Sequence, residues 1–415
     1  MDTGTTAWLL VSAAMVLFMT PGLAFFYGGM DRSRNVLNML MMNFWCILVI
    51  PLVWGLIGYS LAFGGTGSII GNFDFALLRG VDVGEDGGET LLTLVYLGTF
   101  ASITPALISG AVADRMKFAA WAWFVPLWCL LVYVPVVFWI YGGSGDEGVT
   151  GWLGARGSLD FAGGTAIHVN AGIAALAAAL VVGKRKGWPK EGHPPHSMPL
   201  VMIGTGILWF GWFGFNSGSA LAANGVAVQA FANTFFAAAA GGLAWALVEK
   251  VKDGHITNLG AASGIVAGLV AITPAAGFVA GSSSMLIGAA AGVICAFAVS
   301  LKFKAGYDDS LDVVGVHLVG GLVGSLLIGF FAFPGALGDF EAGLFNGGGT
   351  GLLQEQFIAN AVTIVFSFVV TFAILKVLDW IIGVRVSEEE EELGLDLREH
   401  AEVAYNFGET TMGRN

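Results

Sequence analysis

Two histidines in long apolar segments have matching local surroundings. Each one follows an aspartate by eight residues and precedes a glycine by four residues. The two matching sets are Asp160, His168 and Gly172, and Asp309, His317 and Gly321. An ionisable side chain inside a bilayer costs several kcal/mol unless it is paired or lines a transport path. Two such histidines in equivalent places therefore predict a functional site where two related halves of the chain meet.

A pair of imidazole rings is suited to handling a proton. A neutral imidazole is both a hydrogen-bond donor and an acceptor, and it titrates near neutral pH. Two facing rings can share one N–H···N bond, pass a proton, and contact a substrate that carries N–H groups. A metal site is the alternative, but it needs further Cys, His or carboxylate ligands. The residues flanking His168 and His317 are mainly Gly, Ala, Val and Leu, so we expect neither a metal nor a cofactor.

Three aspartates precede the histidines. Asp160 stands at the start of the fifth apolar segment, near Thr165 and two glycines, so we expect it to cap a helix by accepting amide protons. The same carboxylate would favour a cation at a pore entrance. Asp309 and Asp312 stand at the start of the tenth segment, and we expect both to cap it in the same way.

A second feature combines aromatic rings with hydroxyl groups. Residues 211–219 read Gly-Trp-Phe-Gly-Phe-Asn-Ser-Gly-Ser. Aromatic faces attract a cation by roughly 0.5–2 kcal/mol, and a serine hydroxyl can accept a hydrogen bond from an N–H group. Taken alone, this segment gives weak support for cation recruitment. We find no nucleophile–base pair in the sequence, so we do not expect an enzyme.

The elements that must position these residues are membrane-spanning helices. Of the 415 residues, 56% are hydrophobic and 12% are charged, whereas soluble domains carry about 25% charged residues. The 62 glycines favour close contacts between helices. Runs long enough to cross a hydrocarbon core of about 30 Å predict eleven spans, near residues 6–29, 39–63, 90–113, 118–141, 163–183, 199–218, 224–248, 257–277, 284–302, 311–334 and 354–383.

Positive charges are divided unequally between the two sets of alternate loops. One set, with the tail and the end of the last span, contains Arg32, Arg34, Arg115, Lys117, Lys184, Arg185, Lys186, Lys190, Lys250, Lys252, Lys302, Lys304, Lys376, Arg385, Arg398 and Arg414. The other set contains only Arg79 and Arg156. The positive-inside rule then predicts a cell-membrane protein with its N-terminus outside and its C-terminus in the cytoplasm. That topology needs an odd number of spans, and eleven is odd.

The matching histidine sets also predict an internal repeat. The transmembrane domain covers residues 1–384, with a first half at about 1–183 and a second half at about 199–334. Each half has five spans, so the two halves must enter the membrane in opposite orientations. An eleventh helix at about 354–383 lies outside the repeat, and residues 385–415 form a cytoplasmic tail. The expected fold class is an all-α integral membrane protein.

The segment around the first histidine resembles a known signature. Residues 160–172 read Asp-Phe-Ala-Gly-Gly-Thr-Ala-Ile-His-Val-Asn-Ala-Gly and look like the signature of the ammonium transporter (Amt/Mep/Rh) family. Other segments resemble this family in the same order along the chain, namely residues 21–30, 98–101, 211–219 and 312–317. Residues 394–405 resemble the cytoplasmic tail of the Amt branch. The resemblance covers essentially the whole chain.

The resemblance implies eleven helices, a homotrimer and one hydrophobic pore in each subunit. Phe100 and Phe215 would form a stacked gate, and His168 and His317 would form the twin-histidine pair in the pore. The resemblance also implies a PII-type regulatory protein that binds the tail and the inner loops. The outer ammonium site would comprise Tyr141, Ser219 and Asp160, and the supporting positions would be Trp212, Asp309 and Asp312.

Three positions depart from the usual family pattern. Tyr141 stands where the family usually has tryptophan, which gives a smaller aromatic face. Tyr96 and Leu97 replace the usual Phe-Gln before Gly-Thr-Phe, which removes an amide near the gate. Ala401 replaces a glycine of the tail, and alanine would be strained if this position requires a positive φ.

The sequence therefore predicts an ammonium transporter that serves nitrogen uptake. Ammonium would gather outside, lose its proton, and cross as ammonia, while potassium, which has no proton to lose, would be excluded. The main alternative is an ammonium sensor with little flux that signals through a cytoplasmic partner. A channel for neutral gas is a third possibility.

Overall fold

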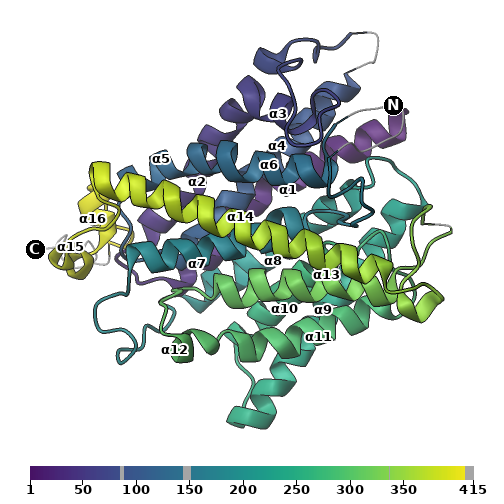
Figure 1. Cartoon of the computed structure of the whole chain (residues 1–415). Coiled ribbons are helices and arrows are strands. Elements are labelled where there is room, and N and C mark those ends of the chain that lie inside the picture. Colours follow the sequence, from purple (N-terminus) through teal and green to yellow (C-terminus); the bar gives the residue numbers. More distant parts are fainter. Residues whose placement is uncertain (85–87, 144–150, 336, 407–415) are drawn as a thin grey trace, which may run out of the picture.

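The computed structural model describes residues 1–84, 88–143, 151–335 and 337–406. Long helices run side by side between two ends of the molecule, and Met1 and helix α16 (Leu395–His400) lie at opposite ends (Figure 1). Arg414 and the last residues of the predicted tail lie outside the described residues.

The first part of the chain forms seven α-helices among the described residues. They are α1 (Thr3–Met30), α2 (Val36–Val53), α3 (Tyr59–Phe63), α4 (Glu89–Ile108), α5 (Phe118–Trp128), α6 (Val134–Tyr141) and α7 (Asn170–Val182). Short turns connect or precede them, namely the π-helical turns η1 (Trp54–Gly58), η4 (Cys129–Tyr133) and η5 (Gly164–Val169) and the 3₁₀ turns η2 (Ala76–Leu78) and η3 (Ser109–Ala111). His168 lies in η5, and such turns occur frequently at functional sites.

The second part also consists of long helices, and among its described residues it has one π-helical turn. Its elements are α8 (Met198–Gly218), α9 (Gly225–Asp253), α10 (Asn258–Ile272), α11 (Ser283–Ala298), α12 (Leu301–Ala305), η6 (Val314–Leu318), α13 (Val319–Phe331), η7 (Leu344–Asn346), α14 (Gly351–Ile382), α15 (Glu388–Leu393) and α16. His317 lies in the π-helical turn η6, directly before α13. Helix α14 runs across the outside of the bundle (Figure 1).

Ten helices among the described residues are long and apolar enough to cross a membrane. They match ten of the eleven predicted spans to within a few residues. The exception is the span predicted at 257–277, because α10 has only 15 residues. At 1.5 Å per residue α10 is about 22 Å long, which is shorter than a hydrocarbon core of about 30 Å. The span predicted at 257–277 is therefore not confirmed as a helix long enough to cross by itself, and α10 covers only Asn258–Ile272 of it.

A folded turn segment takes over where α10 ends. Pro274 stands two residues after the helix, and its ring removes a backbone donor. Asn233 of α9 donates to the carbonyls of Ala276 and Val279, each at 2.8 Å. The Phe161 amide donates to the Pro274 carbonyl at 3.0 Å. Non-helical backbone is tolerated at membrane depth when protein groups satisfy it in this way.

The two parts of the chain meet along α1 and α8 and at the two histidine turns, where α7 packs against η6 and α13 packs against η5. Glycines allow this crossing. A Cβ added to Gly172 would lie 2.4 Å from the Leu318 nitrogen, and a Cβ added to Gly321 would lie 3.0 Å from the Gly164 carbonyl oxygen and 3.2 Å from the His168 Cβ. The glycine four residues after each histidine therefore lies against the opposite half, beside the other histidine segment.

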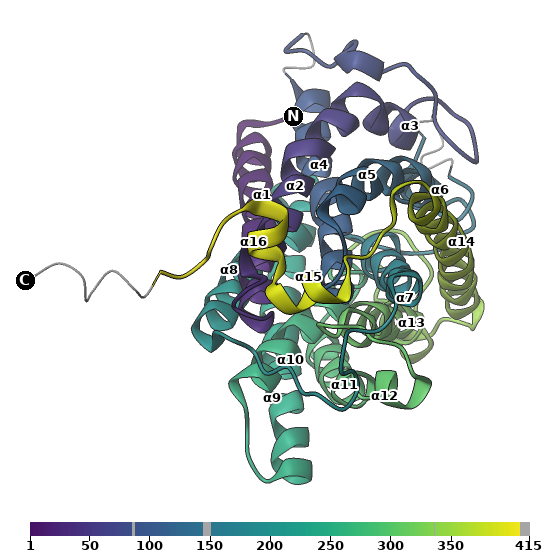
Figure 2. The same ribbon diagram turned by 90° about the vertical axis from the view of Figure 1, so that its left-hand side faces the viewer.

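The C-terminal tail folds back across one end of the bundle (Figure 2). Its anchor is the buried Glu391 of α15, whose carboxylate pairs with Arg385 at 2.8 Å and accepts from the Lys186 amide at 2.8 Å. The Asn38 amide of α2 donates to the Asp396 carboxylate at 2.8 Å. These contacts tie the tail to α2 and to the loop between α7 and α8.

Ala401 follows α16 with a φ of 55°, in the left-handed region. This conformation costs a non-glycine residue about 1–2 kcal/mol. Glycine avoids that cost but loses more conformational entropy on folding, so the net gain in stability from glycine is smaller. We expect Ala401→Gly to tighten the tail, which limited proteolysis of the purified protein would report as slower cleavage between residues 387 and 405. Ala404→Gly is the matched control, because Ala404 has no positive φ. This variant should be cleaved at least as fast as the unmodified protein. Equal cleavage of all three proteins would contradict this account.

Candidate functional site

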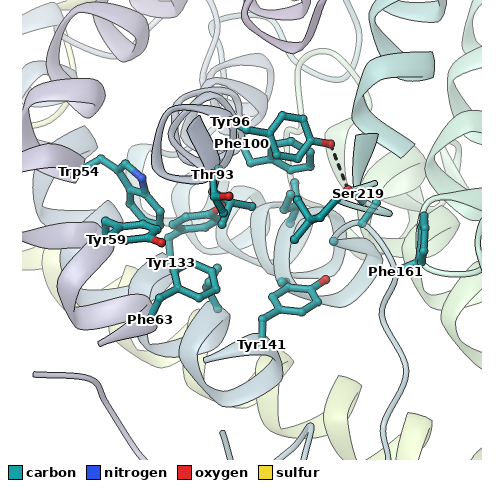
Figure 3. Close-up of a pocket in the computed structure, with 17 residues that line it drawn as sticks. Trp54, Tyr59, Phe63, Thr93, Tyr96, Phe100, Tyr133, Tyr141, Phe161 and Ser219 are labelled. Atoms are coloured by element: carbon teal, nitrogen blue, oxygen red, sulfur yellow. Dashed lines mark hydrogen bonds between the residues drawn. The ribbon is translucent and has the colours of Figure 1, made fainter. Parts of the chain in front are cut away.

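An aromatic cavity of about 350 Å³ opens near the ends of α4, α6 and α8. Its walls are mainly rings, among them Trp54, Tyr59, Tyr96, Tyr133 and Tyr141, with the hydroxyl of Ser219 on one side. Figure 3 shows Tyr96 pointing toward Ser219, while Trp54, Tyr59 and Tyr133 group at the other end of the cavity. Aromatic faces around a small polar spot are suited to a compact cation.

The polar spot consists of two hydroxyl oxygens with both protons engaged. The Tyr96 hydroxyl donates to a backbone carbonyl, with Gly214 O at 2.9 Å and Phe215 O at 3.1 Å. The Ser219 hydroxyl donates to Phe215 O at 2.8 Å, and the two hydroxyl oxygens lie 3.3 Å apart. Each hydroxyl has one proton and two lone pairs, so both oxygens can still accept hydrogen bonds from a ligand in the cavity that they line. They form an acceptor pair for a ligand that carries N–H groups.

Asp160 lies beneath this cavity and is held by backbone amides. Its Oδ1 accepts from Gly163 at 2.9 Å and Gly164 at 2.7 Å, and its Oδ2 accepts from Thr165 at 2.8 Å and Ala166 at 3.0 Å. The expectation of a capping role is therefore confirmed. Both oxygens are occupied, so Asp160 offers its charge rather than a direct contact to a ligand in the cavity.

Phe100 lines the outer cavity, and Phe215 lies behind it and lines the small space at the histidines. Their rings stack with centroids 4.1 Å apart and an interplanar angle of 24°. Phe100 is 4% exposed and Phe215 is 1% exposed, so the stack closes the path. On the far side of the stack the His168 ring lies 6.2 Å from the Phe215 ring, measured between centroids.

The histidine pair lies directly beyond the stack. The Nδ1 atoms of His168 and His317 are 3.2 Å apart, so one ring donates this hydrogen bond and the other accepts it. The two Nε2 atoms must then differ, one carrying a proton and the other a lone pair. His168 Nε2 is buried without a hydrogen-bond partner among the described residues. The pair is thus able to accept a proton on one ring and release a proton from the other.

Trp212 supports the pair from one side. Its ring stacks on His168 with centroids 5.4 Å apart, and its Nε1 donates to the Thr273 hydroxyl at 2.8 Å. Thr273 begins the turn segment after α10, so the interruption of that helix supplies the partner that orients Trp212. The indole ring then fixes the plane of the His168 imidazole.

A series of cavities continues from the histidines toward the tail end. A space of about 10 Å³ contacts both histidines, and a second of similar size is lined by His317, Tyr27, Ser263 and Asp312. The second space shares Met30 and Asp312 with a wider cavity of about 210 Å³. Between the outer cavity and the wide inner one, the structure thus places two small spaces of about 10 Å³ each.

The two aspartates before η6 have different roles. Asp309 accepts from the Val313 amide at 3.1 Å and the Val314 amide at 2.8 Å, as a cap does. Burial raises the pKa of Asp309 to about 6, against the opposing charge of Lys302. The expectation that Asp312 also caps this turn is wrong. Asp309 already occupies the free amides, and Asp312 instead pairs with Lys302 at 2.6 Å.

Two residues at this site did not emerge from the sequence. The sequence comparison marks Tyr96 only as a replacement for the family's usual phenylalanine, although its position four residues before Phe100 puts both rings on one helix face. That spacing was an available signal for the second hydroxyl. Tyr27 lines the path below His317 and donates to the Leu107 carbonyl at 3.2 Å. Nothing in its apolar sequence context distinguishes it from a packing residue.

Comparison with known proteins agrees with this geometry. A model described as the Ammonium Transporter Family matches residues 7–405. An ammonium transporter of Mycobacterium tuberculosis (strain ATCC 25618 / H37Rv) is 50% identical over 435 residues, covering 98% of this chain and 91% of that protein. The structure of Saccharomyces cerevisiae Mep2 has a TM-score of 0.88 at 34% identity, covering 100% of this chain and 94% of that chain. A structure described as a Sensor Amt Protein has a TM-score of 0.88 at 28% identity, covering 96% and 98%. The chain therefore belongs to the ammonium transporter family.

Proposed function

We propose that this transporter takes a proton from ammonium behind the outer cavity and conducts ammonia past the histidine pair. The observation that carries the proposal is the pair itself, with Nδ1 atoms 3.2 Å apart behind a closed aromatic stack. An unpaired cation is costly in such apolar surroundings. Ammonium can lose its charge by giving up a proton, whereas potassium, which is similar in size, cannot. The proposal therefore predicts ammonium transport with potassium excluded.

Recruitment takes place at the outer cavity. Tyr141 and Phe100 offer aromatic faces to the cation, and the oxygens of Ser219 and Tyr96 accept two of its N–H groups. The buried charge of Asp160 stabilises the ion without touching it, because its oxygens bond backbone amides. The rings and hydroxyl oxygens thus hold ammonium next to the Phe100–Phe215 stack, while Asp160 keeps its hydrogen bonds to the backbone amides.

The proton and the ammonia then cross by related routes. Ammonia, a neutral hydrogen-bonding molecule, passes the narrow spaces around the histidines. The proton moves along the imidazoles, because one ring accepts at Nε2 while the shared Nδ1–H···Nδ1 bond transfers a proton to the other ring. Transport by this mechanism carries charge, which distinguishes it from a channel for neutral gas.

The topology expected from the sequence is part of this proposal. We infer eleven crossings, in which α10 and the turn segment after it form the eighth, and an inverted repeat of residues 1–183 and 199–334. The reciprocal glycine contacts at the histidine turns support a repeat. Met1 and α16 lie at opposite ends of the bundle, which agrees with an odd number of crossings, the N-terminus outside and the tail in the cytoplasm (Figure 1). The transmembrane domain then ends near residue 384.

The assembly implied by the family also remains a proposal. We propose a homotrimer with one pore in each subunit and a PII-type regulatory protein at the cytoplasmic face. Exposed apolar side chains on α1 and α9, such as Leu10, Phe18, Phe231 and Phe235, are available to subunits or to lipid. The docked tail, together with α2 and the loop between α7 and α8, offers a surface to a regulator.

Transient currents after concentration jumps test the function. The purified protein is reconstituted in liposomes, and ammonium or potassium is added on a solid-supported membrane. A saturable current with ammonium and none with potassium is expected. If no current appears, a pH dye inside the same vesicles distinguishes a gas channel, which changes the internal pH, from a sensor, which binds ammonium with negligible flux.

Tyr141→Trp is expected to strengthen recruitment. A larger aromatic face adds about 0.5–1 kcal/mol of cation attraction, which corresponds to a half-saturating ammonium concentration roughly two- to fivefold lower. Tyr141→Leu removes the aromatic face and should raise that concentration instead. The concentration dependence of the ammonium current measures both. A Trp variant and a Leu variant with the same half-saturation would show that this face does not bind the ion.

A further inference from the structure

Asp31 is a buried acidic residue for which the transport mechanism above has no role. It follows α1 directly, lines the inner cavity of about 210 Å³, and is 2% exposed. Its Oδ1 accepts from the Arg32 amide at 2.8 Å, whereas its Oδ2 has no hydrogen-bond donor among the described residues. A buried carboxylate oxygen without a donor is costly. The cost disappears if this oxygen carries a proton and finds an acceptor.

Asp114 lines the same inner cavity and is the candidate acceptor. It takes a hydrogen bond from the Asn35 side-chain amide and pairs with Arg32 at 3.0 Å and Arg185 at 3.2 Å. Burial, and then the neighbouring Asp114, raise the pKa of Asp31 well above its usual range. Burial also opposes the ionisation of Asp114, but the hydrogen bond from Asp31 and the two guanidiniums lower the pKa of Asp114. Two carboxyls in this arrangement hold one proton between them.

We propose that Asp31 is the inner proton-exchange site of this transporter, holding a proton against Asp114 and giving it to ammonia that leaves the pore. The proton on Oδ2 supplies the hydrogen bond that this buried oxygen otherwise lacks. This inference rests on the proposed function, because it needs ammonia and a proton to arrive separately at the inner cavity.

The cavities place Asp31 at the end of the route from the histidines. His317 and Tyr27 line the small space below the pair, and this space shares Met30 and Asp312 with the wide cavity that contains Asp31. The Asp31 amide donates to the Tyr27 carbonyl at 2.9 Å, which fixes the aspartate next to this passage. The small space, of about 10 Å³, is close to the minimum for one water molecule. A water there would carry the proton from the imidazole toward Asp31.

The exchange step is balanced within the transport cycle. The O–H bond of Asp31 breaks as an N–H bond forms on ammonia, which yields ammonium and the Asp31 carboxylate. Arg32, beside the pair, stabilises that carboxylate until the next proton arrives along the imidazoles. One ammonium ion is therefore taken up outside and one is released inside in each cycle.

Asp312 is the rival for this role. It lines both inner spaces, but its carboxylate pairs with Lys302 at 2.6 Å and its side chain is 31% exposed. Asp312 is therefore engaged by a cation and partly open to water, whereas Asp31 is buried and its Oδ2 has no hydrogen-bond donor among the described residues. The other charged or titratable groups around Asp31, Asp114 and their cavity are Arg32, Arg185, Glu191, His193, His196 and Asp308. Asp308 neutralises Arg185 at 2.8 Å, and His196 donates to the Asp31 carbonyl at 2.8 Å.

The first test is the ammonium current of Asp31→Asn in liposomes. Asparagine keeps the shape and can still donate to Asp114, but it cannot exchange a proton. We expect the current to fall about 100-fold or more, in the range of a lost acid–base group, while Asp31→Glu retains most of it. Glu191→Gln is the matched control, because Glu191 lines the same cavity and is exposed. A full current in Asp31→Asn would overturn the inference and leave the proposed function intact, whereas no current in the unmodified protein would overturn the proposed function.

Infrared difference spectroscopy tests whether Asp31 is protonated. It can be applied to a variant that folds but does not transport ammonium. The unmodified protein should show the carbonyl stretch of a protonated carboxylic acid at neutral pH, shifted by deuterium exchange. This band should disappear in Asp31→Asn, remain in Glu191→Gln, and change when ammonium is added. A protein without such a band, or with the same band in Asp31→Asn, would show that Asp31 does not hold the proton.

Discussion

Replacing both His168 and His317 by alanine is expected to remove the exclusion of potassium. The two rings line a space of only about 10 Å³, and they meet through one hydrogen bond of 3.2 Å. Without them the passage widens, water enters, and a hydrated cation no longer has to lose a proton. A loss of roughly 3 kcal/mol in the relative barrier would lower the discrimination between ammonium and potassium by about 100-fold. Currents after ammonium and potassium jumps measure this ratio directly.

The single replacements separate the two roles of the pair. His168→Ala or His317→Ala leaves one ring in the passage but breaks the shared Nδ1–H···Nδ1 bond, so each should lose current while potassium stays excluded. His255→Ala is the control, because His255 is exposed between α9 and α10. If the double variant discriminates as well as the unmodified protein, proton removal is not the basis of selectivity.

The crossing elements and the histidine pair could be predicted from the sequence because they depend on local patterns. The length of an apolar run can be read directly from the sequence, and ten of the predicted runs match membrane-length helices among the described residues. The equal spacing from each histidine to a glycine predicted that two halves meet, and Gly172 and Gly321 do lie against the opposite segments. A glycine four residues from a histidine is one helical turn away, so it lies on the same face. Spacing of this kind is a property of one segment and can be read from it.

What could not be predicted depends on partners from elsewhere in the chain. The early end of α10 is stable only because Asn233 of another helix satisfies the carbonyls that follow. Asp312 was expected to cap η6, but the amides of Val313 and Val314 donate to Asp309 instead. Asp312 pairs with Lys302. The hydroxyl of Tyr96 gains its role from Ser219 on a different helix. The sequence around each of these residues does not show which distant residue it will contact.

Asp160→Ala is expected to cause the largest loss of stability of any substitution at the site. Four backbone amides, from Gly163 to Ala166, bond one buried carboxylate at 2.7–3.0 Å. Each hydrogen bond to a charged group contributes about 1.5–3 kcal/mol. Relief from burying the charge offsets part of this, but the remaining loss is a large share of a typical folding stability of about 5–15 kcal/mol. The turn that carries His168 should come apart, and thermal unfolding followed by tryptophan fluorescence should report a much lower midpoint.

Asp309→Ala is the internal comparison that makes this expectation specific. Asp309 stands at the matching position eight residues before His317 but accepts only two amides, from Val313 and Val314. If amide satisfaction is what Asp160 provides, Asp309→Ala should lower the unfolding midpoint by about half as much. Asp160→Asn should fall between the two, because its amide oxygen still accepts from one pair of donors while its NH₂ group faces the other pair. Equal midpoints for Asp160→Ala and Asp309→Ala would mean that the number of amides does not matter, and the charge of Asp160 beneath the outer cavity would then be its main contribution.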